Sequence, residues 1–240
     1  MADPVTTSGK TLVWDLPTRL SHWALAIAVT GAWLTGEFGP IDKTWHMRFG
    51  YAALVLVAFR ILWGFLGGYH ARFTALLPKL EQLFGYLATL PKRQPSPHAG
   101  HNPLGVLSVM ALLAAVAVQA TTGLFADDDI FARGPLATTV SSATRSTLTS
   151  IHVQFQYVVL GLVLLHLAAI AYYSLWKRSD LAKAMVTGKK TVPAGTPDAS
   201  VPETRRRGPV WLAAGLVIGL SLVLWAVITW LPPPRASGWG

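Results

Sequence analysis

The sequence predicts an all-α integral membrane protein, on the basis of its composition and its long apolar stretches. Of the 240 residues, 52% are hydrophobic and only 13% are charged, and the mean hydropathy is +0.44. A soluble domain carries about 25% charged residues. Several apolar stretches reach about 20 residues, the length that a helix needs to cross a bilayer. These two properties together define the predicted fold class.

Apolar stretches and the polar segments between them divide the chain into five expected spans. A short interfacial helix is expected over residues 76–89, inside the polar loop 67–100. The basic linker 177–208 is rich in Pro, Thr and Ser and is expected to be flexible. The predicted spans cover residues 16–36, 46–66, 103–125, 149–175 and 209–231.

The distribution of positive charge predicts the orientation in the membrane. The net charge is +9 and the pI is near 10.1. Lysine and arginine gather in the N-terminal segment, in the loop 67–100 and in the linker 177–208, whereas the other exposed segments hold few. By the positive-inside rule, the N-terminus is predicted to be cytoplasmic and the C-terminus to lie outside. Nucleic acid is not expected as a partner, because the basic residues flank apolar spans.

The absence of cysteine excludes several cofactors. The chain contains no cysteine at all. It therefore cannot supply thiolate ligands to a metal, attach a c-type haem covalently or hold an iron–sulfur cluster.

Two histidines lie in the same apolar stretch, residues 149–175. His152 and His166 are 14 residues apart, so in a helix their side chains point within about 40° of each other and are separated by about 21 Å. Gly161 lies between them, where a missing side chain would let a flat group approach the backbone. Ionisable residues inside spans are functional candidates by default. The alternative is a pair of polar side chains hydrogen-bonded within a helical bundle.

With the predicted topology, four histidines sort into two pairs at matching depth. His22 and His166 lie towards the cytoplasm, and His46 and His152 lie towards the outside. Two facing imidazoles are what a six-coordinate b-type haem requires. Zinc would need more ligands at one depth. A proton relay by histidines also stays open, although no acidic residue accompanies them in mid-span.

Four segments of the chain carry a family resemblance. They read VWDLPTRLSHWALAIAVTGAWLTGE, HMRFGYAALVLVAFRILWGFLGGYHARF, GHNPLGVLSVMALLAAVAVQATTGLFADDDIFARGPLA and IHVQFQYVVLGLVLLHLAAIAYYSL. Together they resemble the bacterial cytochrome b561 family, which also takes in the b-type cytochrome subunits of nickel–iron hydrogenases. The resemblance covers about residues 11–190 and touches the first four spans in order. The fifth span lies outside the family's minimal pattern.

The resemblance implies a four-helix transmembrane bundle that holds two haems b, followed by an additional C-terminal transmembrane helix. Family ligand positions match His22 and His166 on the cytoplasmic side, and His46 and His152 on the periplasmic side. The expected domains are a dihaem domain, a cytoplasmic linker, a transmembrane helix and a periplasmic tail, over residues 1–190, 191–208, 209–231 and 232–240.

The implied function is electron transfer across the bacterial inner membrane, between the quinone pool and a periplasmic cytochrome or dehydrogenase of the respiratory chain. One alternative is a membrane anchor subunit of a hydrogenase-like complex. Another is an enzyme that oxidises superoxide and reduces ubiquinone, as some relatives do. A non-redox transporter or scaffold is the remaining alternative. Self-association as a homodimer is left open.

Two arginines are further candidates for binding the cofactor. Arg60 lies inside the second span, where its guanidinium would either bind a haem propionate in bidentate fashion or extend to the interface. Arg19 precedes His22 by one turn. Its guanidinium would either bind a haem propionate or serve only as a positive charge on the cytoplasmic side that sets the topology.

Other polar residues have simpler expected roles. His101 and Asn102 are expected to form an interfacial cap at the start of the third span. His70 and His98 are expected to be solvated loop residues. The acidic run at residues 127–129 is expected to be solvated, or else to steer a basic redox partner.

Overall fold

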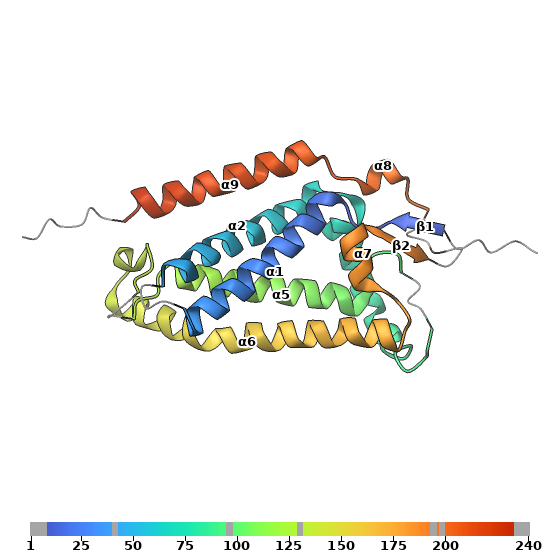
Figure 1. The fold of residues 1–240 in the computed structure, drawn as a ribbon, viewed down its shortest axis with the longest axis horizontal. Coiled ribbons are helices and arrows are strands. Elements are labelled where there is room, and N and C mark those ends of the chain that lie inside the picture. The colour runs from blue at the N-terminus through green and yellow to red at the C-terminus, as the bar shows by residue number, and fades with distance from the viewer. Residues whose placement is uncertain are drawn as a thin grey trace, which may run out of the picture. The chain divides into compact units, whose positions relative to one another are not determined.

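The protein is helical in a computed structural model, which describes residues 9–39, 43–94, 98–128, 132–192, 196 and 200–232 (Figure 1). The long helices are α1 (Leu16–Glu37), α2 (Thr44–Leu66), α5 (Pro103–Gly123), α6 (Ser142–Leu175) and α9 (Val210–Trp230). Shorter elements are β1 (Gly9–Leu12), α3 (Phe73–Leu76), α4 (Leu83–Leu87), α7 (Leu181–Thr187), β2 (Lys189–Val192), α8 (Glu203–Arg206), and the 3₁₀ turns Tyr69–Ala71, Leu77–Gln82 and Ala137–Thr139.

Four described helical stretches are long and apolar enough to cross a membrane, which agrees with the prediction of a helical membrane protein. The predicted first span forms α1, but α1 is not among these four, since Arg19, Ser21 and His22 lower its hydropathy. The predicted tail falls mostly on residues 233–240, which lie outside the described residues. The four stretches are Thr44–Leu66, Pro103–Gly123, Ser142–Leu175 and Glu203–Trp230.

The chain divides into two compact units, and each long helix contributes to both. Unit 1 consists of residues 1–23, 60–112 and 161–214. Unit 2 consists of residues 24–59, 113–160 and 215–240.

Polar caps define where the helices of unit 1 begin. Asp15 Oδ1 accepts a hydrogen bond from Thr18 N at 2.9 Å, at the start of α1. Asn102 Oδ1 accepts one from Gly105 N at 2.8 Å and so caps α5, which confirms the cap expected there. Side-chain acceptors at this position satisfy backbone N–H groups that have no partner within the helix.

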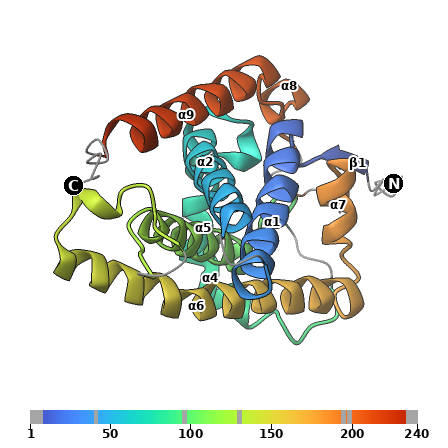
Figure 2. The ribbon, with the colours of Figure 1, turned by 60° about the vertical axis from the view of Figure 1, so that its left-hand side comes forward.

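A two-stranded sheet joins the N-terminal segment to the linker, a feature that the all-α prediction did not include. β1 pairs antiparallel with β2, with Gly9 opposite Val192. Beside the sheet, α7 ends at Gly188, which has a φ of +79° and accepts hydrogen bonds through its carbonyl from Val13 N and Trp14 N. β1 and α7 lie together in both views, and Figure 1 shows β2 beside them (Figure 2). The linker expected to be flexible therefore contains regular structure.

Asp15 also connects three parts of unit 1. Its Oδ2 accepts hydrogen bonds from Trp63 Nε1 at 3.2 Å, from Gly68 N at 3.0 Å and from Gly208 N at 3.2 Å. The residue is 4% exposed. The segment that leads into α9 is thus fixed to the start of α1 and to the end of α2.

The predicted interfacial helix forms as short helical pieces, α3, a 3₁₀ turn and α4, rather than as one helix. The hydroxyl groups of Tyr86 and Tyr173 are hydrogen-bonded at 2.9 Å. Lys177 Nζ donates to the carbonyls of Thr89 at 2.8 Å and Lys92 at 2.7 Å. These bonds hold the loop that follows α4 against the end of α6.

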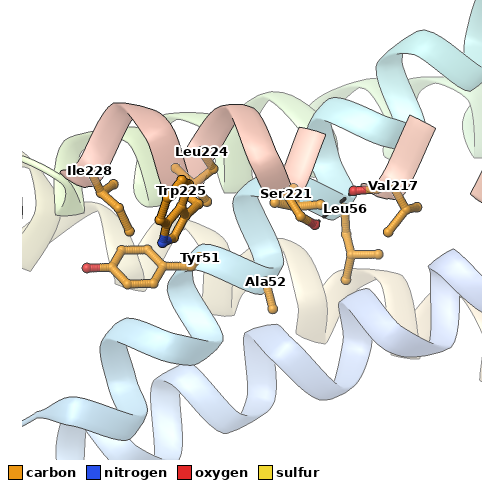
Figure 3. A pocket seen from close by; sticks show the side chains of 9 residues that line it. Tyr51, Ala52, Leu56, Val217, Ser221, Leu224, Trp225 and Ile228 are labelled. Carbon is orange, nitrogen blue, oxygen red and sulfur yellow. Dashed lines mark hydrogen bonds between the residues drawn. The ribbon is translucent and has the colours of Figure 1, made fainter. Parts of the chain in front are cut away.

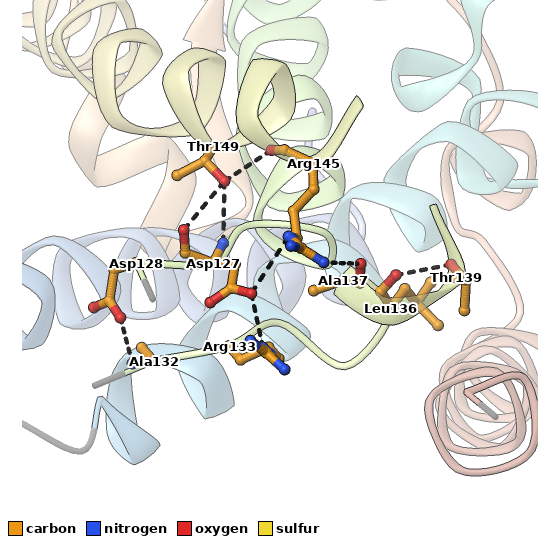
Figure 4. Close-up of polar contacts among 9 residues, drawn as sticks. All are labelled: Asp127, Asp128, Ala132, Arg133, Leu136, Ala137, Thr139, Arg145 and Thr149. Carbon is orange, nitrogen blue, oxygen red and sulfur yellow. Dashed lines mark hydrogen bonds and ion pairs between the residues drawn. The ribbon is translucent and has the colours of Figure 1, made fainter. Parts of the chain in front are cut away.

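In unit 2, a buried carboxylate orders the loop between α5 and α6 (Figure 4). Asp127 Oδ2 lies 2.7 Å from Arg133 Nε and 3.4 Å from Arg145 Nε, and the Asp127 side chain is 3% exposed. Asp127 N donates to Thr149 Oγ1 at 3.1 Å. The expectation of a solvated acidic run is wrong for Asp127, because two arginines neutralise it. Asp129 lies outside the described residues.

Candidate functional site

Unit 1 brings His22 of α1 and His166 of α6 together. Their ring centres are 6.4 Å apart and their ring planes make an angle of 50°. Both residues are partly buried. His22 Nδ1 is buried and has no hydrogen-bond partner within the described part of the chain. The two imidazoles therefore face each other without a polar neighbour that fixes the tautomer of His22.

Unit 2 brings His46 of α2 and His152 of α6 together. Their ring centres are 5.9 Å apart and their planes make an angle of 82°. His46 Nδ1 lies 2.8 Å from the carbonyl oxygen of Ala32, and His152 Nδ1 lies 2.9 Å from that of Gln119. A carbonyl oxygen can only accept, so each Nδ1 carries the hydrogen. Each Nε2 then has a free lone pair.

The separation of the rings suits a shared metal. A metal–imidazole bond is about 2.0–2.1 Å long, and the ring centre lies about 1.1 Å behind the nitrogen, so two opposed imidazoles on one metal have centres about 6.3 Å apart. The observed 6.4 and 5.9 Å are close to this value. Rotation about the metal–nitrogen bond leaves the angle between the planes free, so 50° and 82° are both compatible.

A metal site built from protein groups alone does not fit either pair. No group of three or more His, Cys, Asp or Glu side chains converges among the residues that the structure describes. Structural zinc sites use four such ligands. Two axial imidazoles instead suit a metal whose other ligands belong to a planar cofactor.

Unit 1 also holds the two candidate arginines. Arg60 is 8% exposed and acts electrostatically on His22, and its Nη1 donates to Ala71 O at 3.2 Å. Its guanidinium is therefore buried within unit 1 and bonded to the backbone of the turn that follows α2. Arg19 Nη1 donates to Val186 O at 2.5 Å, while its buried Nε has no hydrogen-bond partner in the described residues.

Gly161, the glycine predicted to make room on α6, has open space beside it. A Cβ built on this residue would meet no heavy atom within 4 Å. Helical geometry places Gly161 about 180° around α6 from His152 and about 140° from His166. The open space beside it therefore lies off the face that carries the two imidazoles.

The loop histidines of unit 1 differ from expectation. His70 is only 3% exposed, so the prediction that it is solvated is wrong. His101 packs against Trp14 with ring centres 4.5 Å apart, and its Nδ1 is buried. Burial, with further contributions from Arg60 and Lys79, lowers the pKa of His101 well below its ordinary value. His101 is therefore a neutral residue of the interior rather than a simple cap.

Sequence analysis missed Gln119. It lies on α5, and its Nε2 donates to the backbone carbonyl of His152 at 2.9 Å. The same nitrogen lies 3.3 Å from His152 Nδ1, but both atoms carry hydrogens, so that contact is not a hydrogen bond. The available signal was a glutamine in an otherwise apolar span, since such residues tend to be functional.

A cavity of about 420 Å³ lies elsewhere in unit 2, between α2 and α9 (Figure 3). Its lining is mainly apolar, and the Ser221 hydroxyl in it already donates to Val217 O at 2.8 Å. No histidine lines this cavity, so it is separate from the paired imidazoles. The lining residues are Tyr51, Ala52, Val55, Leu56, Val217, Ser221, Leu224, Trp225 and Ile228.

Four apolar helical stretches of spanning length, together with two pairs of facing imidazoles on α1, α2 and α6, define the class of the protein, a helical membrane protein with paired histidines. The chain belongs to the prokaryotic cytochrome b561 family, whose model matches residues 13–188. It is accordingly a b-type cytochrome of electron transport, and the family implies haem b.

Three relatives are each named a probable Ni/Fe-hydrogenase B-type cytochrome subunit. The protein of Azotobacter chroococcum mcd 1 is 24% identical over an aligned length of 222 positions, and the match covers 78% of this chain and 90% of the relative. The protein of Azotobacter vinelandii is 26% identical over 44% of this chain and 54% of its own length. The protein of Rhizobium leguminosarum bv. viciae is 28% identical over 38% of this chain and 48% of its own length. No solved structure matches the chain significantly.

Proposed function

We propose that the protein is a dihaem b-type cytochrome, with His22 and His166 as the axial ligands of one haem and His46 and His152 as those of the other. The observation that carries the proposal is the spacing of the rings. Two independent pairs have centre-to-centre distances of 6.4 and 5.9 Å, close to the separation of two imidazoles on one metal.

The tautomers of the second pair support this ligand set. Histidines that bind metals almost always donate their other ring N–H to a carbonyl, a carboxylate or water. His46 and His152 both donate through Nδ1 to helix carbonyls, which leaves both Nε2 atoms available.

The charge of unit 1 suits the carboxylates that a haem carries. Arg60 is buried beside His22, and Arg19 has a buried Nε that could donate. Both are proposed to bind propionates, because a guanidinium matches a carboxylate in geometry and charge.

A haem b held in this way supplies one-electron iron chemistry. With an iron held by two histidines no position would be open, so the haem would supply electron transfer and would not bind oxygen at the metal. The apolar helices exclude water from the imidazoles. With the N-terminus in the cytoplasm and the C-terminus in the periplasm, the protein would carry electrons across the inner membrane between quinone and a periplasmic cytochrome or dehydrogenase.

A second candidate function is that of a subunit of a hydrogenase complex. The names of the three relatives favour it. Copurification of the tagged chain with a nickel–iron protein from its native membranes would support this function, whereas isolation with a soluble cytochrome would favour the carrier.

The direct test is a reduced-minus-oxidised visible spectrum of the purified protein, with haem per chain from the pyridine haemochrome. We expect a low-spin b-type spectrum and two haems per chain. One haem per chain would contradict the dihaem assignment, and protein made with ample haem that binds none would contradict the cytochrome function.

A further inference from the structure

The two carbonyls that accept from the imidazoles of unit 2 share a local arrangement. Ala32 lies on α1 and Gln119 on α5, and each is followed four residues later by a glycine, Gly36 and Gly123. A helix carbonyl bonds the N–H of the residue four positions later, but its oxygen has a second lone pair. The imidazole of His46 or His152 occupies this second acceptor site. The hydroxyls of Thr35 and Thr122 lie 3.3 and 3.0 Å from the same two oxygens, but each is closer to the carbonyl one residue earlier in the helix, at 2.5 and 2.8 Å.

Both glycines lie directly against the imidazoles. A Cβ added to Gly36 would lie 2.8 Å from His46 Nδ1 and 3.1 Å from His46 Cε1. A Cβ added to Gly123 would lie 2.8 Å from His152 Cε1 and 3.1 Å from His152 Nδ1. Side chains that begin with Cβ would therefore push either ring away from its carbonyl.

We propose that Gly36 and Gly123 are positioning residues of the His46–His152 centre, and that the hydrogen bonds they admit lower the reduction potential of the haem bound there. A hydrogen bond from Nδ1–H raises the basicity of the imidazole as a ligand. A more basic ligand stabilises ferric iron relative to ferrous iron, so the potential falls. This inference rests on the proposed ligation of that haem.

Unit 1 lacks a counterpart of this arrangement. His22 Nδ1 has no hydrogen-bond partner within the described residues. The proposal therefore predicts an effect confined to one of the two haems, which a general loss of stability would not produce.

The test is a potentiometric titration of Gly36→Ala and Gly123→Ala in the full-length protein with both haems bound. We expect one of the two midpoint potentials to rise by about 59 mV in each variant. For a one-electron couple this is about a tenfold change in the ferric-to-ferrous ratio at a fixed potential. The shifted haem should be the one that His46→Ala removes. Its low-spin electron paramagnetic resonance signal should shift as well.

Gly219→Ala is the matched control, because a Cβ on this α9 glycine meets no heavy atom within 4 Å. Selective loss of the His46–His152 haem from a glycine variant would also support the proposal. Two bound haems with both potentials unchanged, or shifted equally, would overturn it. Wild-type protein that binds no haem would instead refute the proposed function.

If both alanine variants fail to fold, the two potentials are compared in Arg60→Gln protein, which keeps both glycines and removes the buried charge of unit 1. The haem that His46→Ala removes should then have the lower midpoint, because both of its ligands donate through Nδ1 to helix carbonyls. A midpoint equal to or above that of the other haem would overturn the proposal.

Discussion

The two units hold similar imidazole pairs in different surroundings. The ring separations, 6.4 Å in unit 1 and 5.9 Å in unit 2, are nearly the same. In unit 2 both imidazoles donate to helix carbonyls, whereas His22 Nδ1 in unit 1 has no hydrogen-bond partner among the described residues. Unit 1 also buries the guanidinium of Arg60. Equal spacing of ligands can therefore support two centres with unequal electronic properties.

The buried carboxylates of the two units also have different surroundings, with neutral hydrogen-bond donors in unit 1 and charged partners in unit 2. Asp15 in unit 1 accepts from an indole and from backbone N–H groups, all of them neutral. Asp127 in unit 2 is paired with Arg133 and Arg145. Unit 1 also buries basic side chains. These side chains are Arg60, Lys79, Lys177 and Arg206.

The largest expected effect is the loss of a whole haem. We expect His166→Ala to remove one haem and His46→Ala to remove the other, because a six-coordinate iron needs both axial imidazoles. Haem per chain should fall from two to one in each variant, and the remaining spectrum should differ between them. The control is His98→Ala, which alters a histidine outside both pairs. If a single substitution removed both haems, the pairs would not be independent sites.

Substitution of the buried carboxylates should destabilise the units in different ways. We expect Asp127→Asn to cost about 2 kcal/mol, because it removes the partner of two arginines that are themselves partly exposed. Asp15→Asn should cost about 1–2 kcal/mol and should release the segment that ends at Gly208. Thermal unfolding in detergent measures both effects.

Limited proteolysis separates these two variants. Trypsin should cleave at residues 205–207 faster in Asp15→Asn than in wild type, and at the wild-type rate in Asp127→Asn. Asp128→Asn is the control for the loop, since Asp128 Oδ1 accepts from Ala132 N at 2.7 Å in an exposed segment. Equal cleavage in the Asp15 and Asp127 variants would contradict separate roles for the two carboxylates.

Sequence analysis found the imidazole pairs because their signal is periodic. Polar residues in apolar stretches stand out, and helical geometry places His152 and His166 on one face. The neighbours of the pairs could not be found in this way. The acceptors for His46 and His152 are backbone atoms, which every residue has, and only three-dimensional contact selects Ala32 and Gln119.

Long-range pairing explains the remaining differences. Composition alone suggested a flexible linker and a solvated Asp127. The linker gains order from β1, more than 170 residues earlier in the sequence, and Asp127 is buried by Arg133 and Arg145. Such partners leave no local pattern that predicts the pairing, because each residue type is ordinary for a loop.

A smaller effect should follow from removing the buried charge beside His22. We expect Arg60→Gln to lower the midpoint potential of the His22–His166 haem by about 59 mV, which is about a tenfold change in the ferric-to-ferrous ratio at a fixed potential. The reason is that a nearby cation favours the ferrous state. The other midpoint should not move. Arg48→Gln is the matched control, since Arg48 stacks on Trp45 in unit 2. Equal shifts of both midpoints would mean that Arg60 does not distinguish the centres.

The smallest expected effect concerns the positive interior of unit 1. Burial, and to a lesser extent Lys79, lowers the pKa of Lys190 to about 8. Between this value and about 10.4 in the unfolded chain, unfolding takes up a proton, so stability rises with pH in that window. From pH 8 to 9.5 we expect wild type to gain about 1 kcal/mol relative to Lys190→Met. Thermal unfolding measures the stability of both proteins as a function of pH, and we expect the two stability curves to converge or cross. Substitution of an exposed lysine, Lys183→Met, is the control. Parallel stability curves for wild type and Lys190→Met would contradict the lowered pKa.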